Sequence, residues 1–136
     1  KSLIHGDVFW DNIIYLDGEF QALIDFDDAC YYYSIYDLGI ALSGACVEVN
    51  GTLDLEKAAH VIAGYQNVRP LFPEEKAVLH IFTHYSVVAI SFWRYMKYNQ
   101  YNPIEDKKTL HREKVTLADR IKAIPPAKFN QIFDAI

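Results

Sequence analysis

The spacing of apolar and polar positions changes once along the chain. Residues 2–26 contain two short runs rich in β-branched and aromatic side chains, "NIIYL" and "FQALIDF", with "LDGE" between them. An Asp-Gly pair between two such runs is typical of a tight β-hairpin. We therefore expect strands at 12–16 and 20–26 that pair antiparallel around Asp17-Gly18, preceded by a further strand in "KSLI".

From residue 34 onward the apolar positions recur every three or four residues, which is the period of an α-helix. The pattern predicts helices over 34–46, 54–68, 73–98, 111–123 and 126–135. Asp54 suits the start of the second helix, because its side chain can accept hydrogen bonds from the first backbone amides. Pro73 suits the first position of the third helix. Trp93 lies on the apolar stripe of that long helix, and we expect it to face the core, with a ligand pocket as the alternative.

These elements predict an α+β, mainly α fold: a small β-hairpin with a polar loop (1–30) followed by a helical bundle (34–136), in a single domain over 1–136. A length of 136 residues, 51% of them hydrophobic, is enough for a buried core. The net charge of −5 argues against a nucleic-acid surface. The apolar stretches are too interrupted to span a bilayer, so no membrane partner is expected.

The two cysteines, Cys30 and Cys46, have no zinc-binding or CxxC spacing. We expect both to be buried thiols in a reducing compartment, which predicts a cytoplasmic protein. A disulfide between them is the alternative.

A cluster of polar residues, "IHGDVFWDN" at 4–12, interrupts the β-rich part. The predicted hairpin places Asn12 nearly opposite Asp25, with His5 and Asp7 beside them. Oxygen donors of this kind suit Mg²⁺, and a further carboxylate can accept a proton from a hydroxyl nucleophile. Asp25 has apolar neighbours in sequence, where a bare carboxylate is costly unless a cation or donors satisfy it. The set thus contains the parts needed for metal-assisted phosphoryl transfer.

Each of these residues taken singly also has a structural interpretation. A lone Asp or Asn in a loop is commonly a turn or capping residue, and we assign Asp11 and Asp17 to turns. His5 at a strand end suits a hydrogen-bonded core position. Asp37 suits the first turn of a helix, where the dipole favours a negative charge.

"HGDVFWDN" followed by "LIDFDDA" resembles the catalytic loop and metal-binding segment of the aminoglycoside phosphotransferase and choline kinase family, small-molecule kinases with a protein-kinase-like fold. "YDLGIAL" at 36–42 is similar to the helix that follows this segment in the family. "AGYQNVRPLFPEE" and "SFWRYMKYN" are similar to type II homoserine kinases within that group. The resemblance covers most of the chain and is weaker in specificity after residue 75.

Carried over residue by residue, the resemblance implies that Asp7 is the catalytic base that accepts the proton of the substrate hydroxyl. It implies that Asn12 and Asp25 bind the Mg²⁺ that bridges the ATP phosphates. It also implies that His5 and Asp37 support the catalytic loop.

Asp27 departs from the family pattern within "DFDDA". It is a candidate contact for a second Mg²⁺ or for a water, with an exposed loop residue as the alternative. Acceptor sites in such kinases lie between the catalytic loop and the helices. The candidates for contact with the substrate are Tyr32, Arg69, His84 and Arg94, since an Arg is well shaped to hold a carboxylate.

The function that the resemblance implies is ATP- and Mg²⁺-dependent phosphorylation of an alcohol group on a small molecule, most similar to homoserine. The alternatives are another acceptor, of the aminoglycoside, choline, hydroxylysine or methylthioribose type, or a non-catalytic helical binding module. The six glycines form no phosphate-covering loop, and no V-A-I-K lysine is present. We therefore expect this chain to be the C-terminal lobe of a longer kinase, lacking the N-terminal nucleotide-binding lobe. Such a fragment would be inactive alone and prone to self-association through the surface which that lobe would cover.

Overall fold

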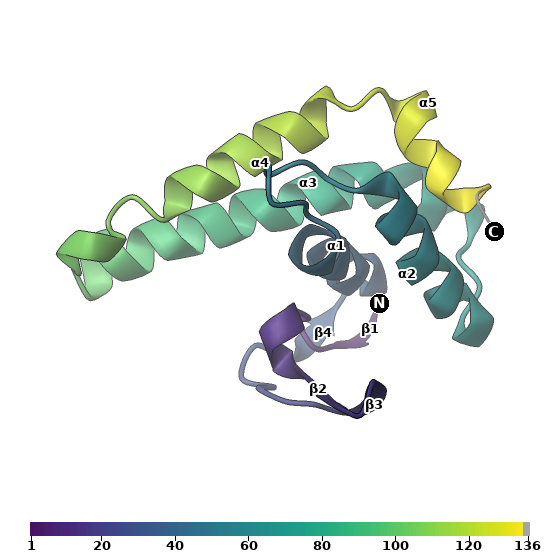
Figure 1. Cartoon of the computed structure of the whole chain (residues 1–136), viewed down its shortest axis with the longest axis horizontal. Helices are drawn as coiled ribbons and strands as arrows, with labels where there is room; N and C mark the ends of the chain where they lie inside the picture. Colours follow the sequence, from purple (N-terminus) through teal and green to yellow (C-terminus); the bar gives the residue numbers. More distant parts are fainter. Residues whose placement is uncertain (135–136) are drawn as a thin grey trace.

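The computed structural model describes residues 1–134, whose elements are labelled in Figure 1. The strands are β1 (Ser2–Ile4), β2 (Ile13–Leu16), β3 (Glu19–Leu23) and β4 (Cys30–Tyr32). The helices are α1 (Ser34–Ala45), α2 (Leu55–Val68), α3 (Pro73–Tyr95), α4 (His111–Ala123) and α5 (Pro126–Phe129). Short 3₁₀ turns span Trp10–Asn12, Glu105–Lys107 and Asn130–Phe133, and a π-helix, Met96–Tyr101, continues α3. The predicted α+β, mainly helical fold is confirmed.

The predicted hairpin is present, with shorter strands than expected. β2 and β3 pair antiparallel, with Ile13 facing Leu23. Asp17 and Gly18 form the turn with φ angles of 51° and 81°, a left-handed pair that Asp-Gly adopts at low cost. Asp25 lies beyond the end of β3 because its own φ of 62° takes the chain out of the extended conformation.

A second two-stranded sheet, formed by β1 and β4, was not predicted in full, because β4 has only three residues and no local hairpin partner. The two strands are antiparallel, with Ile4 facing Cys30. The segment that follows β1 and the segment that precedes β4 therefore leave the sheet at the same end. This pairing brings residues 5–12 and 24–29 together.

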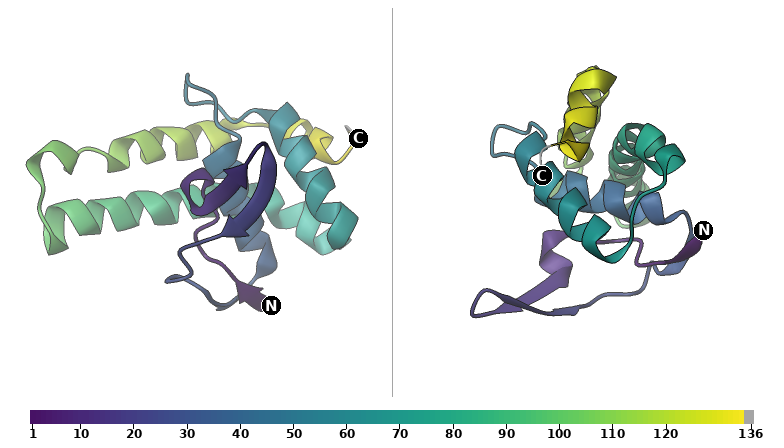
Figure 2. Two further views of the ribbon diagram at one scale, coloured as in Figure 1. Left: turned by 60° about the horizontal axis from the view of Figure 1, so that its bottom comes forward. Right: turned by 90° about the vertical axis from the view of Figure 1, so that its right-hand side faces the viewer.

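The helices form a bundle on one side of the β-structure. Helices α3 and α4 lie side by side and antiparallel, α1 crosses α3, and the β2–β3 hairpin projects from the opposite side of α1 (Figures 1 and 2). Gly39 allows the close crossing of α1 and α3, because a Cβ at this position would lie 2.8 Å from the carbonyl oxygen of Phe82. The core between the helices includes Ile35, Leu38, Leu42, Ala58, Ala59, Ile62, Leu79, Val87, Leu117, Ala118, Ile121, Phe129 and Ile132.

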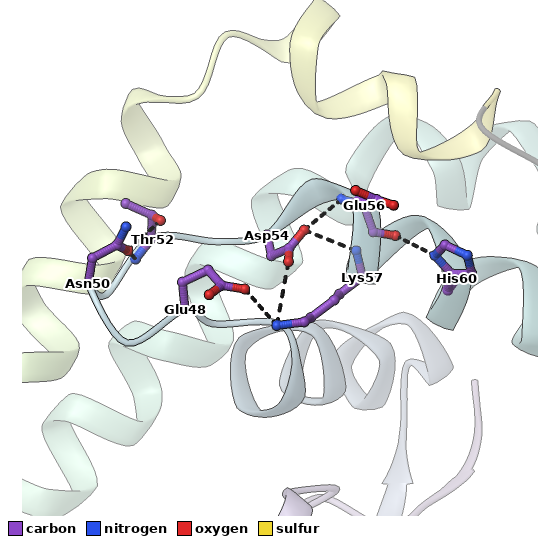
Figure 3. A network of polar contacts seen from close by, with 7 residues as sticks. All are labelled: Glu48, Asn50, Thr52, Asp54, Glu56, Lys57 and His60. Atoms are coloured by element: carbon purple, nitrogen blue, oxygen red, sulfur yellow. Dashed lines mark hydrogen bonds and ion pairs between the residues drawn. The ribbon is translucent and has the colours of Figure 1, made fainter.

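The start of α2 is capped as its sequence predicts. The Asp54 carboxylate accepts hydrogen bonds from the backbone amides of Glu56 at 2.9 Å and Lys57 at 3.1 Å (Figure 3). The Lys57 amine also lies 2.6 Å from a Glu48 carboxylate oxygen and 3.5 Å from one of Asp54. The amide of Lys57 is the largest influence that holds the pKa of Asp54 below its usual range. This network fixes the loop between α1 and α2.

Two expectations about the helices need correction. The last predicted helix ends at Phe129 and continues only as a 3₁₀ turn, and residue 135 lies outside the described residues. The long apolar stripe of α3 is only partly buried: Val78 and Phe82 pack against the core, whereas other members face outward. Ile81 and Phe92 are about two-thirds exposed and Trp93 is 52% exposed, whereas Leu79 and Val87 are fully buried. The buried face of α3 also contains Thr83, Ser86 and Ser91, whose hydroxyls donate to backbone carbonyl oxygens, so apolar periodicity alone did not identify the covered side. No helix in residues 1–134 is long and apolar enough to cross a membrane.

Candidate active site

Helix α1 anchors the polar loop through one carboxylate. Asp37, in the first turn of α1, accepts hydrogen bonds from the backbone amides of His5 at 2.7 Å and Gly6 at 2.8 Å, one on each carboxylate oxygen. Hydrogen bonds to a charged acceptor are stronger than neutral ones. The backbone that leads into Asp7 is therefore held at a defined position relative to the helix.

His5 joins the two loops that meet beside the β1–β4 sheet. Its ring is buried, and Nε2 lies 3.0 Å from the carbonyl oxygen of Ile24. Because a carbonyl only accepts, Nε2 donates, and Nδ1 is then free to accept the backbone amide of Asp7 at 3.3 Å. The ring also contacts Phe26, with 4.4 Å between the ring centroids.

Gly6 permits the closest approach between these loops. Its φ is +85°, and a Cβ at this position would lie 2.5 Å from the backbone carbonyl oxygen of Asp28. Any other residue would combine a left-handed backbone with a backbone clash. The Gly between His5 and Asp7 is therefore required by the geometry of the loop.

Asn12 fixes the side chain of Asp7. The Asn12 Nδ2 donates to Asp7 Oδ2 and to the Asp7 carbonyl oxygen, both at 2.9 Å. The backbone amide of Phe9 donates to the same carbonyl oxygen at 2.8 Å. Within residues 1–134, Oδ1 of Asp7 has no hydrogen-bond partner, so one carboxylate oxygen remains available to a ligand.

The surroundings of Asp7 make its carboxylate more basic than usual. Burial is the largest cause that raises the pKa of Asp7, and the negative charges of Asp28, Asp11 and Asp25 raise it further. The hydrogen bond from Asn12 opposes these effects without cancelling them. A carboxylate with a raised pKa is a better proton acceptor when it is ionised.

The surroundings of Asp25 differ from those that the sequence predicts. It was expected to be enclosed by apolar neighbours, but its side chain is exposed, because the left-handed backbone at this residue turns it out of the hairpin. Within residues 1–134 there is no group of three or more His, Cys, Asp and Glu side chains that could hold a metal ion. Mg²⁺ at a phosphoryl-transfer site needs only one or two protein oxygens, with phosphate and water as the other ligands. The Asn12 amide oxygen and the Asp25 carboxylate fit that requirement in their chemistry.

A cavity of about 500 Å³ opens beside Asp7. It contains two of the four substrate candidates named from the sequence, Tyr32 of β4 and Arg94 of α3. Trp93, expected in the core, also lines it. The remaining lining residues are Ile4, Gly6, Phe9, Asp11, Asp28, Cys30, Tyr36, Ala89 and Ile90. Residues of the loops, of β1 and β4 and of α1 and α3 therefore line the same cavity as Asp7.

The structure does not bring Arg69 or His84 to this cavity. Arg69 forms a two-point ion pair with Glu75, at 2.7 and 3.1 Å, at the junction of α2 and α3. His84 is half-buried on α3 and is not among the lining residues. Asp27 is exposed and is likewise not among them.

Other residues of the cavity were missed from the sequence or expected elsewhere. Asp28 lies next to Asp27 in "DFDDA" and is the one of the two that faces the cavity. Tyr36 directly precedes Asp37, and burial raises its pKa to about 12. Cys30 was expected to be buried, but it is exposed, and it is a free thiol like Cys46. Cys30 lies on β4, in a sheet of only two strands that borders the cavity, and this position explains its exposure.

Comparison with known proteins identifies the family to which the chain belongs. The Phosphotransferase enzyme family matches residues 1–71, more than half of the chain. The chain belongs to this family, which confirms the resemblance seen in its motifs.

The individual relatives reported below are all named homoserine kinase. The chain is 38% identical over 84 residues to the homoserine kinase of Phenylobacterium zucineum, covering 62% of this chain and 26% of that protein. It is 41% identical over 79 residues to the homoserine kinase of Gluconacetobacter diazotrophicus, covering 58% and 25%. It is 44% identical over 79 residues to that of Chelativorans sp., covering 58% and 24%. The chain thus matches only about a quarter of the length of these curated relatives.

Proposed function

We propose that this chain provides the acceptor-activating part of an ATP-dependent kinase that phosphorylates the hydroxyl of a small molecule of the homoserine type. The observation that carries this proposal is the Asp7 carboxylate, which Asn12 holds at the edge of the cavity while one oxygen remains open. The names of the relatives support homoserine over the other acceptors. In this proposal Asp7 is the base.

The reaction converts an alcohol and ATP into a phosphate ester, ADP and a proton. The hydroxyl oxygen attacks the γ-phosphorus while the bond from that phosphorus to the β,γ-bridging oxygen breaks, and the leaving electrons go to ADP. Asp7 accepts the hydroxyl proton and later releases it to solvent. The raised pKa of Asp7 suits this step.

Asn12 and Asp25 would hold Mg²⁺ at this site. A bound Mg²⁺ supplies neutralisation of the negative charge on the phosphate oxygens. Asp37 and His5 act as positioning residues, because they fix the backbone that carries Asp7. Asp27 remains a proposed contact for a second Mg²⁺ or a water, on the exposed side of the same loop.

The nucleotide-binding part of the site is proposed to come from a separate lobe of the full-length protein. The fraction of the relatives that this chain matches supports that proposal. The chain would then correspond to a C-terminal lobe of a protein-kinase-like fold. Positioning of ATP against the acceptor accounts for much of the rate in such enzymes, so turnover should require both parts.

The test is Asp7→Asn in the full-length gene product, with ADP release measured against homoserine, serine, choline and an aminoglycoside. We expect kcat with homoserine to fall by roughly 10²- to 10⁴-fold, with KM for ATP little changed. Asp17→Asn, in the hairpin turn, is the matched control and should keep full turnover, since Asn tolerates the left-handed backbone. Near-normal turnover of Asp7→Asn would remove the assignment of the base.

The substrate panel separates the remaining alternatives. Turnover with homoserine no greater than with choline or the aminoglycoside would favour another acceptor. Absence of ADP release with every alcohol would favour a non-catalytic binding module.

A further inference from the structure

The cavity beside Asp7 has charges of opposite sign on different walls. Asp7, Asp11 and Asp28 lie on the loops that flank the β1–β4 sheet. Arg94 of α3 is the one cationic side chain among the lining residues, all of which belong to the described part of the chain. A ligand that carries both charges can therefore be oriented in this cavity, with its anionic group towards α3.

The guanidinium of Arg94 is poorly satisfied by the protein. Its Nη1 lies 3.4 Å from the carbonyl oxygen of Leu110 and 3.7 Å from a carboxylate oxygen of Glu113. Both contacts are long, and the Glu113 side chain is 74% exposed, so this ion pair is weak. Its Nε and Nη2 have no hydrogen-bond partner within residues 1–134.

Arg69 shows the contrasting case in the same chain. Its two terminal nitrogens reach both carboxylate oxygens of Glu75 at 2.7 and 3.1 Å. That geometry is the one in which a guanidinium fork matches a carboxylate. Arg94 presents the same guanidinium fork at the cavity wall, and its side chain is only 27% exposed. Within the described residues it has no carboxylate at this two-point distance.

A second cation, Lys114, lies near Arg94 without lining the cavity. Burial lowers the pKa of the Lys114 amine, and the nearby charge of Arg94 lowers it further. The same amine lies 5.6 Å from the ring centroid of Phe9, which lines the cavity. The positive charge of Lys114 adds to the attraction of an anionic group by Arg94.

We propose that Arg94 binds the carboxylate of the acceptor and is the residue that selects an amino acid over a cationic alcohol. This inference rests on the proposed function and specifies its substrate class: a zwitterionic α-amino acid with a terminal hydroxyl. With the carboxylate at Arg94, the three acidic side chains of the loops disfavour the reversed orientation, and the hydroxyl end is left for Asp7. Choline and aminoglycosides carry no anionic group for Arg94.

The kinetic test compares homoserine with 3-amino-1-propanol, which is homoserine without its carboxylate, in the full-length gene product. Arg94→Gln should raise KM for homoserine by about 10- to 100-fold and leave kinetics with 3-amino-1-propanol unchanged. Arg94→Lys keeps the charge without the fork and should give an intermediate KM. Arg112→Gln, an exposed arginine of α4, is the matched control and should change neither.

A binding test needs no ATP and no turnover. Cys30 is exposed and lines the cavity, whereas Cys46 is buried and its pKa is raised to about 11, so only Cys30 should react rapidly with a disulfide reagent such as DTNB. In the 136-residue chain, homoserine should slow this reaction. The homoserine concentration for half-protection should rise in Arg94→Gln by the same factor as KM.

The outcomes separate this inference from the proposed function. Turnover of homoserine that is insensitive to Arg94→Gln, or an equal loss with both alcohols, overturns the role of Arg94 and leaves the kinase activity standing. Failure of homoserine to protect Cys30 in the unmodified chain also overturns it. Absence of ADP release with every alcohol removes the proposed function itself.

Discussion

The attachment of the polar loop at residues 4–12 to α1 through Asp37 allows a quantitative test. In Asp37→Ala both carboxylate oxygens are lost, and the backbone amides of His5 and Gly6 lose their acceptors at 2.7 and 2.8 Å. In Asp37→Asn one oxygen remains, but the new NH₂ group faces the second amide. The two variants therefore remove the contact in different degrees.

The expected magnitudes follow from these two bonds. A hydrogen bond to a charged group contributes about 1.5–3 kcal/mol. Because Asp37 is only partly buried, the lower value applies to each bond, and Asp37→Ala should reduce the free energy of unfolding by about 3 kcal/mol. Asp37→Asn should reduce the free energy of unfolding by about 2 kcal/mol, because one hydrogen bond is lost and the new NH₂ donor then faces a backbone N–H donor.

Urea unfolding of the chain measures these changes, followed by the fluorescence of its two tryptophans. Asp119→Asn, an exposed residue of α4, is the matched control and should lie within about 0.5 kcal/mol of the unmodified chain. In the full-length gene product both Asp37 variants should lower kcat, because the backbone of Asp7 is no longer held. Stability of Asp37→Ala equal to that of the control would refute the anchoring role.

Gly6 and Glu75 define two further perturbations. Gly6→Ala should cost at least about 2 kcal/mol in urea unfolding, because it adds left-handed strain to a clash with the Asp28 carbonyl, and an unchanged midpoint would contradict the loop geometry. Glu75→Gln should cost about 1 kcal/mol at neutral pH, because Arg69 loses its charged partner. The hydrogen bond from Arg69 is the largest influence that lowers the pKa of Glu75 below its ordinary 4.5, so this stabilisation is present above that value and is lost as the pH falls through the lowered pKa. The stability difference between Glu75→Gln and the unmodified chain should therefore shrink on acidification, and a pH-independent difference would contradict the ion pair.

The local features of the fold could be predicted from the sequence because they depend on neighbouring residues. The Asp17-Gly18 turn, the cap at Asp54 and Pro73 at the start of α3 each follow from the backbone preferences of a few residues. The motif around Asp7 was also recognisable, because its spacing is confined to one short loop. Family membership was predicted from that motif and confirmed by comparison.

The composition of the cavity could not be predicted in the same way. Two arginines looked equivalent as substrate contacts, and only the fold distinguished them: Arg69 faces Glu75 across a helix junction, whereas Arg94 faces the cavity. Trp93 was expected in the core because of its place on the apolar stripe, and Cys30 was expected to be a buried thiol, yet both line the cavity. Burial depends on which neighbour covers a side chain, and that neighbour comes from a distant part of the chain.

The sequence by itself predicted the first strand, the β2–β3 hairpin with its turn, the five helical segments and the polar loop that contains Asp7. The tertiary structure alone decided that β1 pairs with β4, that Asp28 and Arg94 lie on the walls of the same cavity, and that the stripe of α3 is largely exposed. The physical reason is the range of the interactions. Turns and caps depend on backbone geometry within a few residues, whereas a cavity depends on side chains brought together from segments about 65 residues apart in the chain, such as Asp28 and Arg94.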